Sequence, residues 1–168
     1  MLTTLIEGIS SKWLLFFGTS FAFLATTMAL KYISHLLPRD LGREFAHDGK
    51  KSAGKPRGAG LIFVLTFALA ALLFGKAETE LLIYLVLIVG AMMTGFLDDA
   101  SRNPWGEYKK GFLDFLISLA IAITYLSYES NQIHLPLLQM DFTIPYPLFG
   151  ALIVILVWVS INVTNCTD

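Results

Sequence analysis

The sequence contains little charge for its length and almost no cysteine. Charged residues make up 15% of the 168 residues, whereas a soluble domain carries about 25%. Apolar residues make up 55% of the chain, and the mean hydropathy is +0.66. The single cysteine, Cys166, excludes an intramolecular disulfide and a zinc site built from cysteines. Together these features exclude an ordinary soluble domain and indicate a membrane protein.

Two further kinds of site find no support in the sequence. No run has the order Gly-x-x-x-x-Gly-Lys-Ser/Thr, so a Walker-type phosphate loop is absent. The three histidines are scattered, and none has a second histidine or cysteine at the spacing of metal ligands: His35, His47 and His134. We expect neither a histidine metal site nor a nucleic-acid partner.

Long apolar blocks are what the sequence has instead. Five blocks come near the roughly 20 residues that a helix needs to cross a bilayer, at about 13–37, 58–74, 81–97, 111–128 and 147–161. Strict alternation is absent, so helices are expected. No small-residue cleavage site follows the first block, which we interpret as a retained span rather than a signal peptide. The predicted fold class is an all-α polytopic membrane protein, with residues 1–168 forming one membrane domain.

The distribution of basic residues predicts the orientation of the spans across the membrane. Cytoplasmic connections carry an excess of Lys and Arg, and here the first and third connections hold nearly all of them. The N-terminus is therefore expected outside, and residues 162–168 are expected on the cytoplasmic side after the fifth span. The fourth connection, 129–146, has no Lys or Arg and is expected to form a short strand or hairpin on the outer surface. The basic residues of the first and third connections are Arg39, Arg43, Lys50, Lys51, Lys55, Arg57, Arg102, Lys109 and Lys110.

Three polar clusters fall on the predicted cytoplasmic side. The first is Lys50-Lys-Ser-Ala-Gly-Lys-Pro-Arg-Gly-Ala-Gly60. Its glycines allow tight turns and close backbone approach, and its cations suit a phosphate or pyrophosphate group. The alternative is a basic loop that touches anionic lipid headgroups, and the residues of this loop taken alone favour that alternative.

The second cluster is the pair Asp98 and Asp99, at the end of the apolar run 81–97. Two adjacent like charges at a membrane boundary cost free energy, so a cation is expected beside them. Carboxylates are hard ligands that suit Mg²⁺, and one of them could instead accept a proton from a phosphate nucleophile. The alternative is a structural charge boundary in which the pair is bridged to Arg102 and Lys109.

The third cluster is Asn162-Val-Thr-Asn-Cys-Thr-Asp168. Asn162, Asn165 and Asp168 are spaced three apart, so consecutive members are neighbours on a helix. Amide and carboxylate groups at a membrane edge can bind the hydrogen-bonding edge of a nucleobase or sugar. Ordinary helix capping is an equally good interpretation of this cluster taken alone.

The order and spacing of the clusters resemble the polyprenyl-phosphate hexose-1-phosphate transferases, and most closely their MraY-type branch, the phospho-N-acetylmuramoyl-pentapeptide-transferases. Gly95-Phe-Leu-Asp-Asp99 looks like that family's double-Asp motif in full. Residues 162–168 resemble its Asn-Ala-Thr-Asn-Leu-Thr-Asp motif, with two positions changed. Gly54-Lys-Pro-Arg-Gly-Ala-Gly60 is a poorer match to Gly-Thr-Pro-Thr-Met-Gly-Gly. Lys51 stands in for the preceding lysine of the family, and Arg102 falls where the family often has Lys.

The resemblance implies a ten-span enzyme of the bacterial inner membrane with a cytoplasmic, Mg²⁺-dependent site, pairing as a homodimer. Such an enzyme transfers phospho-N-acetylmuramoyl-pentapeptide from its UDP-activated form to undecaprenyl phosphate, giving lipid I and UMP. Asp98 is implied as the base on the lipid phosphate, with Asp99 holding charge or metal nearby. The implied metal ligands are Asp98, Asp99 and Asp168, and the implied substrate-binding residues are Lys51, Lys55, Arg57, Arg102, Asn162, Asn165 and Asp168.

The chain stops in the middle of a motif and holds about half of the family's spans, so we expect the parent protein to continue and this stretch alone to be inactive. Two alternatives stay open. One is the sister branch that transfers N-acetylglucosamine-1-phosphate to polyprenyl phosphate. The other is a transporter or non-catalytic membrane subunit, in which Asp98 and Asp99 would form a coupling or structural pair.

Overall fold

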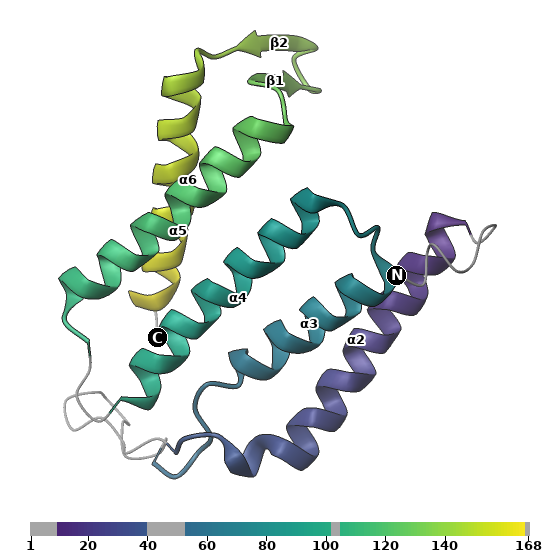
Figure 1. The fold of residues 1–168 in the computed structure, drawn as a ribbon, viewed down its shortest axis with the longest axis vertical. Coiled ribbons are helices and arrows are strands. Elements are labelled where there is room, and N and C mark those ends of the chain that lie inside the picture. Colours follow the sequence, from purple (N-terminus) through teal and green to yellow (C-terminus); the bar gives the residue numbers. More distant parts are fainter. Residues whose placement is uncertain (1–9, 40–52, 102–104, 167–168) are drawn as a thin grey trace.

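The computed structural model describes residues 10–39, 53–101 and 105–166, and among these it is mostly helical (Figure 1). A helix lies in each of the five predicted segments. The helices are α2 (Ser11–Ile33), α3 (Gly60–Phe74), α4 (Thr79–Ala100), α5 (Glu107–Tyr128) and α6 (Tyr146–Cys166), with a short 3-10 turn η1 (Ser34–Leu36) after α2.

Four of the helices, α2, α4, α5 and α6, are long and apolar enough to cross a membrane, and α3 is shorter, with 15 residues. The surface of the bundle is apolar and suits contact with lipid, since large apolar side chains such as Leu15, Phe23 and Val86 are exposed. Helix α3 has no charged residue on any side, which is typical of a helix surrounded by protein and lipid. The helical class and its membrane-compatible character are therefore confirmed.

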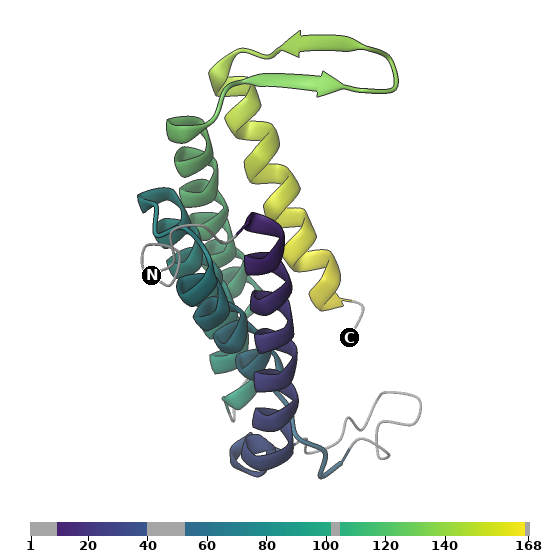
Figure 2. The same ribbon diagram turned by 90° about the vertical axis from the view of Figure 1, so that its right-hand side faces the viewer.

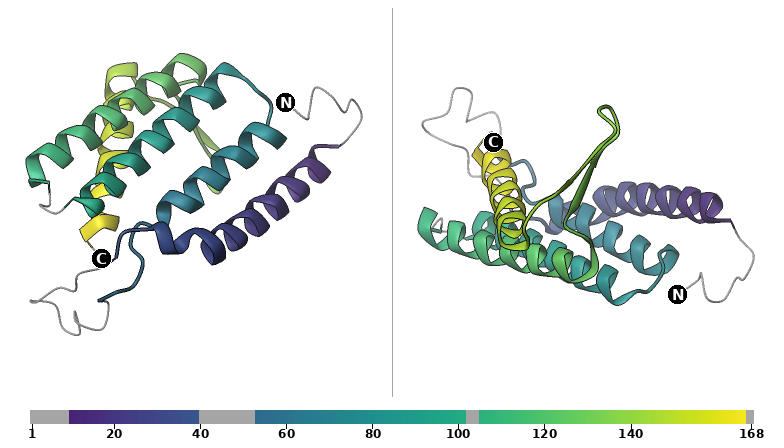
Figure 3. Two further views of the ribbon diagram at one scale, coloured as in Figure 1. Left: turned by 60° about the horizontal axis from the view of Figure 1, so that its bottom comes forward. Right: turned by 90° about the horizontal axis from the view of Figure 1, so that it is seen from above.

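Consecutive helices are neighbours in space. Helix α2 packs on α3, α3 on α4, α4 on α5, and α5 on α6. Figures 1 and 3 show the first four lying side by side, with α6 crossing α5. Because neighbours run in opposite directions, the α2–α3 and α4–α5 connections meet at one end of the bundle. We call this the site end, and it brings together the described parts of the two basic connections, residues 34–39 and 53–59 with 101 and 105–106.

A β-hairpin occupies the opposite end, as predicted. Strands β1 (Gln132–Leu135) and β2 (Met140–Thr143) pair antiparallel and project beyond α5 and α6 (Figure 2). His134 lies opposite Asp141, and their Nδ1 and Oδ1 atoms are 2.6 Å apart. Helix α6 then begins at Tyr146, and Pro147 in its first turn needs no hydrogen-bond partner for its nitrogen.

Specific contacts fix neighbouring helices in register. The hydroxyls of Thr26 and Thr66 form a hydrogen bond between α2 and α3. The Trp158 indole Nε1 of α6 donates to the Gly111 carbonyl of α5 at 2.9 Å. Gly18 lies against Phe74, since a Cβ there would be 3.1 Å from the Phe74 Cβ. Among the described residues the core is thin, and its buried apolar side chains are Leu37, Ile62, Ala68, Ala70, Leu85, Ala122 and Phe149.

Candidate functional site

Asp98 lies in the last turn of α4 and is held by the connection that follows it. The Trp105 backbone N–H donates to Asp98 Oδ1 at 2.7 Å. The Lys110 ammonium Nζ lies 3.5 Å from Asp98 Oδ2. The side chains of Asp98 and Lys110 are only 17% and 14% exposed. The two carboxylate oxygens of Asp98 thus have different partners, one a fixed backbone donor and one a flexible cation.

Asp99 is paired with a different basic residue and is more exposed to solvent than Asp98. Its Oδ1 lies 3.5 Å from Arg57 Nη2, with side-chain exposures of 45% for Asp99 and 33% for Arg57. Successive helix residues point about 100° apart, so Asp98 faces α5 while Asp99 faces the α2–α3 connection. An exposed ion pair of this kind contributes about 0–1 kcal/mol. Loss of the Arg57–Asp99 pair would therefore cost little stability.

The position of Arg57 follows from the backbone before α3. The Arg57 N–H donates to the Pro38 carbonyl at 2.7 Å, and Arg39 Nη1 donates to the Gly54 carbonyl at 2.9 Å. These bonds tie the described ends of the α2–α3 connection together. They set Arg57 beside α4 and leave Lys55 exposed in the turn.

Gly58 lets this backbone approach α4. Its φ is +75°, which L side chains rarely adopt. A Cβ at this position would lie 2.8 Å from Phe96 Cδ2. Phe96 is two residues before Asp98, so the contact with Gly58 seats the connection next to the double carboxylate.

Lys109 is engaged elsewhere. Its Nζ lies 3.8 Å from the centre of the Trp105 ring, in a cation–π contact. The structural alternative placed Lys109 beside the carboxylates, but Lys110 is the residue beside Asp98. The other expected partner, Arg102, lies outside the described residues, as does Lys51.

The carboxylates of Asp98 and Asp99 are oxygen ligands of the type that binds a divalent cation. Mg²⁺ prefers oxygen ligands, and it is often held by one or two carboxylates together with substrate phosphates and water. Asp98 Oδ2 and Asp99 Oδ1 are such oxygens. Each lies 3.5 Å from the nitrogen of a basic side chain, which is long for a charge-assisted hydrogen bond. Within the described ranges, no group of three or more His, Cys, Asp or Glu side chains gathers at one place. Asp168, the third expected ligand, lies outside those ranges.

The described part of the third cluster is helical, as the three-residue spacing of its polar side chains indicated. Helix α6 continues to Cys166, so Asn162 and Asn165 are helical residues that follow the predicted span 147–161. The Asn162 Nδ2 donates to the Trp158 carbonyl of its own helix at 2.9 Å. Helix α6 runs back toward the site end (Figure 2). The side-chain amide of Asn162 therefore bonds within its own helix, and the side chain of Asn165 lies outside the described part of the structure.

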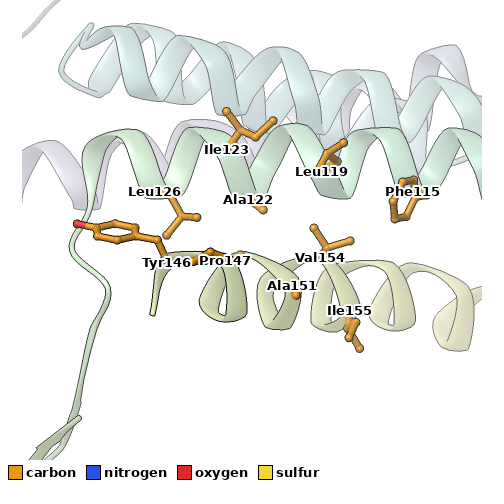
Figure 4. Close-up of a pocket in the computed structure, with 11 residues that line it drawn as sticks. Phe115, Leu119, Ala122, Ile123, Leu126, Tyr146, Pro147, Ala151, Val154 and Ile155 are labelled. Atoms are coloured by element: carbon orange, nitrogen blue, oxygen red, sulfur yellow. The ribbon is translucent and has the colours of Figure 1, made fainter. Parts of the chain in front are cut away.

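An apolar groove of about 480 Å³ separates α5 from α6 nearer the hairpin. In Figure 4, side chains from both helices line it, among them Phe115, Leu119 and Val154. Its lining includes no charged residue, so the groove offers mainly apolar contact.

Asp114 is the residue that sequence reasoning missed. It is the single charged residue between 111 and 128, and it is only 1% exposed. A charged residue inside a predicted span is a signal of a functional site. It lies one helical turn after Lys110.

The sequence profile of glycosyl transferase family 4 matches residues 81–168. That range contains the double carboxylate, Lys110 and the third cluster. The chain belongs to this family.

Curated relatives agree with the profile. A phospho-N-acetylmuramoyl-pentapeptide-transferase of Treponema pallidum (strain Nichols) is 43% identical over 136 residues, covering 79% of this chain and 37% of the relative. Proteins of the same name from Symbiobacterium thermophilum and Fervidobacterium nodosum are 31% and 30% identical, covering 69% and 82% of this chain and 38% and 45% of the relatives. The chain thus spans less than half the length of these relatives. No solved structure matches it.

Proposed function

We propose that this chain contributes the double-carboxylate part of a phospho-N-acetylmuramoyl-pentapeptide-transferase site in a bacterial inner membrane. The donor would be UDP-N-acetylmuramoyl-pentapeptide, the acceptor undecaprenyl phosphate, and the products lipid I and UMP. The observation that carries the proposal is that Asp98 and Asp99 lie at one end of the bundle with Arg57 and Lys110 beside them. Membership of the family supports the choice of reaction.

The reaction exchanges one phosphoanhydride for another. An oxygen of the lipid phosphate forms a bond to the sugar-linked phosphorus of the donor, the bond from that phosphorus to the bridging oxygen breaks, and UMP leaves. In this proposal Asp98 accepts any proton carried by the attacking lipid phosphate. Arg57 and Lys110 stabilise the charge that builds on the phosphate oxygens, and such stabilisation is typically the largest contribution to phosphoryl transfer.

Asp98 and Asp99 are the residues that would hold Mg²⁺, with Asp168 as the further predicted ligand. When bound, Mg²⁺ would neutralise charge on the diphosphate and hold it in line with the acceptor. The positive-inside rule supports a cytoplasmic position for the site end. A homodimer stays a prediction.

Product analysis tests this function. The unchanged chain and the variants used in activity measurements are expressed within the full-length parent protein. Membranes that contain it are supplied with undecaprenyl phosphate, Mg²⁺ and either UDP-N-acetylmuramoyl-pentapeptide or UDP-N-acetylglucosamine, and the lipid products are identified by mass spectrometry. We expect a muramoyl-pentapeptide diphospholipid and a matching amount of UMP from the first donor only. A product from the second donor alone would favour the sister branch. Release of no lipid product, together with substrate flux across vesicles, would favour a transporter.

A further inference from the structure

The Asp114 carboxylate is buried in α5 without a complete set of partners. Its side chain is 1% exposed, and its Oδ2 has no hydrogen-bond partner among the described residues. An ionised carboxylate removed from water costs several kcal/mol unless a cation or a donor compensates it. Asp114 therefore needs a cation or a donor that can reach it.

Two donors on the packed helices α5 and α6 bond to backbone carbonyls rather than to the Asp114 carboxylate. The Ser118 hydroxyl donates to the backbone carbonyl of Asp114 at 2.7 Å, not to its carboxylate. The Trp158 Nε1 donates to the Gly111 carbonyl. The charged groups whose fields act on Asp114 are Lys110 and Asp98. Lys110 is the only cation of the two.

Lys110 is placed to serve two carboxylates. It precedes Asp114 by four residues, so the two side chains are neighbours on the same face of α5. Its flexible four-carbon stem lets the ammonium group move by several ångströms. In this structure the ammonium lies with Asp98, at 3.5 Å, while Asp114 Oδ2 is left without a partner.

We propose that Asp114 is a positioning residue that accepts the Lys110 ammonium group when a divalent cation occupies Asp98. The inference rests on the proposed function, because it assumes that Asp98 binds the metal. A divalent cation at Asp98 repels an ammonium group a few ångströms away. Transfer of Lys110 by one turn to Asp114 removes this repulsion, completes the partners of the buried carboxylate and keeps the lysine within the site.

Loss of the Asp114 charge leaves Lys110 with one carboxylate. It would then compete with the metal for Asp98 Oδ2, and metal affinity would fall. A change in an outer-shell partner of a metal site typically costs 10- to 100-fold in affinity, and we expect about tenfold for Asp114→Asn. The effect must vanish when Lys110 is absent, because there is then no competing ammonium group to hold away.

The test is a double-mutant cycle read by Mn²⁺ binding alone. The protein, Asp114→Asn, Lys110→Met and the double variant are purified in detergent, and the free Mn²⁺ signal is titrated by electron paramagnetic resonance. We expect Asp114→Asn to weaken binding about tenfold, Lys110→Met to bind at least as tightly as the unchanged protein, and the double variant to match Lys110→Met. Asp114→Glu, which retains a carboxylate, is expected to bind more tightly than Asp114→Asn.

Equal weakening by Asp114→Asn in both backgrounds would overturn the inference, since it would indicate a general charge or folding effect. No weakening in either background would also overturn it. Asp98→Asn separates this from the proposed function: Mn²⁺ binding that survives Asp98→Asn would place the metal elsewhere and contradict the proposed site itself. If Asp114→Asn aggregates, Asp114→Ser, which also removes the carboxylate, is compared with the unchanged protein, each with and without Lys110→Met, and gives the same coupling.

Discussion

The Lys110 ammonium group lies 3.5 Å from the Asp98 carboxylate, and more than four-fifths of each side chain is shielded from solvent. The two residues come from different helices, α4 and α5, so the pair exists only because those helices pack side by side. A shielded ion pair is less screened by salt than an exposed one. The Trp105 backbone N–H holds the other carboxylate oxygen of Asp98, Oδ1. Lys110 is therefore the partner of Asp98 that can move in response to a bound phosphate or metal.

Lys110→Met is expected to lower the transfer rate about 100-fold, since removal of one group that stabilises transition-state charge costs about 100- to 1,000-fold. The measurement is UMP release at saturating donor and acceptor. Lys109→Met is the matched control: Lys109 is the neighbouring cation, and its contact is with the Trp105 ring. Equal losses in the two variants would contradict a specific role for Lys110.

Arg57→Met is expected to raise the KM for the nucleotide sugar about tenfold, because one charge-assisted hydrogen bond contributes about 1.5–3 kcal/mol. Arg57→Lys should recover part of the loss, since the charge remains but the planar fork does not. Steady-state kinetics in membranes measures the effect. Lys76→Met serves as the control, because Lys76 is exposed in the α3–α4 connection at the far end of the bundle. A wild-type KM in Arg57→Met would count against Arg57 as a phosphate ligand.

Gly58→Ala is expected to displace the α2–α3 connection from α4. A non-glycine residue at φ +75° costs about 1–3 kcal/mol, and its Cβ would also collide with Phe96. We expect a lower thermal midpoint and a raised KM like that of Arg57→Met. Gly60→Ala is the control, because a Cβ at Gly60 meets nothing within 4 Å. An unchanged KM in Gly58→Ala would show that this contact does not position Arg57.

Trp158→Phe removes the hydrogen bond from α6 to the Gly111 carbonyl. A hydrogen bond of this kind contributes about 1 kcal/mol, so the thermal midpoint should fall by a few degrees. Trp13→Phe, at an exposed ring on α2, should leave the midpoint nearly unchanged. The two midpoints are compared in the same detergent, and equal midpoints would show that the bond contributes nothing.

Apolar blocks predicted the helices well because membrane helices need apolar residues on every side. The hairpin was also predictable, since Pro136, Pro145 and Pro147 stand among apolar residues in a connection that carries little charge. The spacing of Asn162, Asn165 and Asp168 also indicated that the helix continues past the fifth apolar block. Asn and Thr can remain helical when the turn before them provides bonds, and Asn162 forms one with Trp158.

The pairing of charges at the site could not be read from the sequence. Lys109 and Lys110 are adjacent and chemically identical, and only the rotation of α5 against α4 decides which one faces Asp98. The Lys109 ammonium group instead makes a cation–π contact with the Trp105 ring. Asp114 did carry a readable signal, because a lone acid in an apolar span is rarely accidental. Its burial and its unpartnered oxygen required the structure.

The most direct test of the account is the rate of phospho-muramoyl-pentapeptide transfer in Asp98→Asn, measured beside Glu107→Gln. Asparagine keeps the shape of the side chain but loses the charge that would bind metal and accept a proton. Glu107 is an exposed acid at the start of α5, so its variant matches the change in charge. We predict that Asp98→Asn loses transfer by at least about 1,000-fold while Glu107→Gln keeps it. Full transfer by Asp98→Asn would contradict the account.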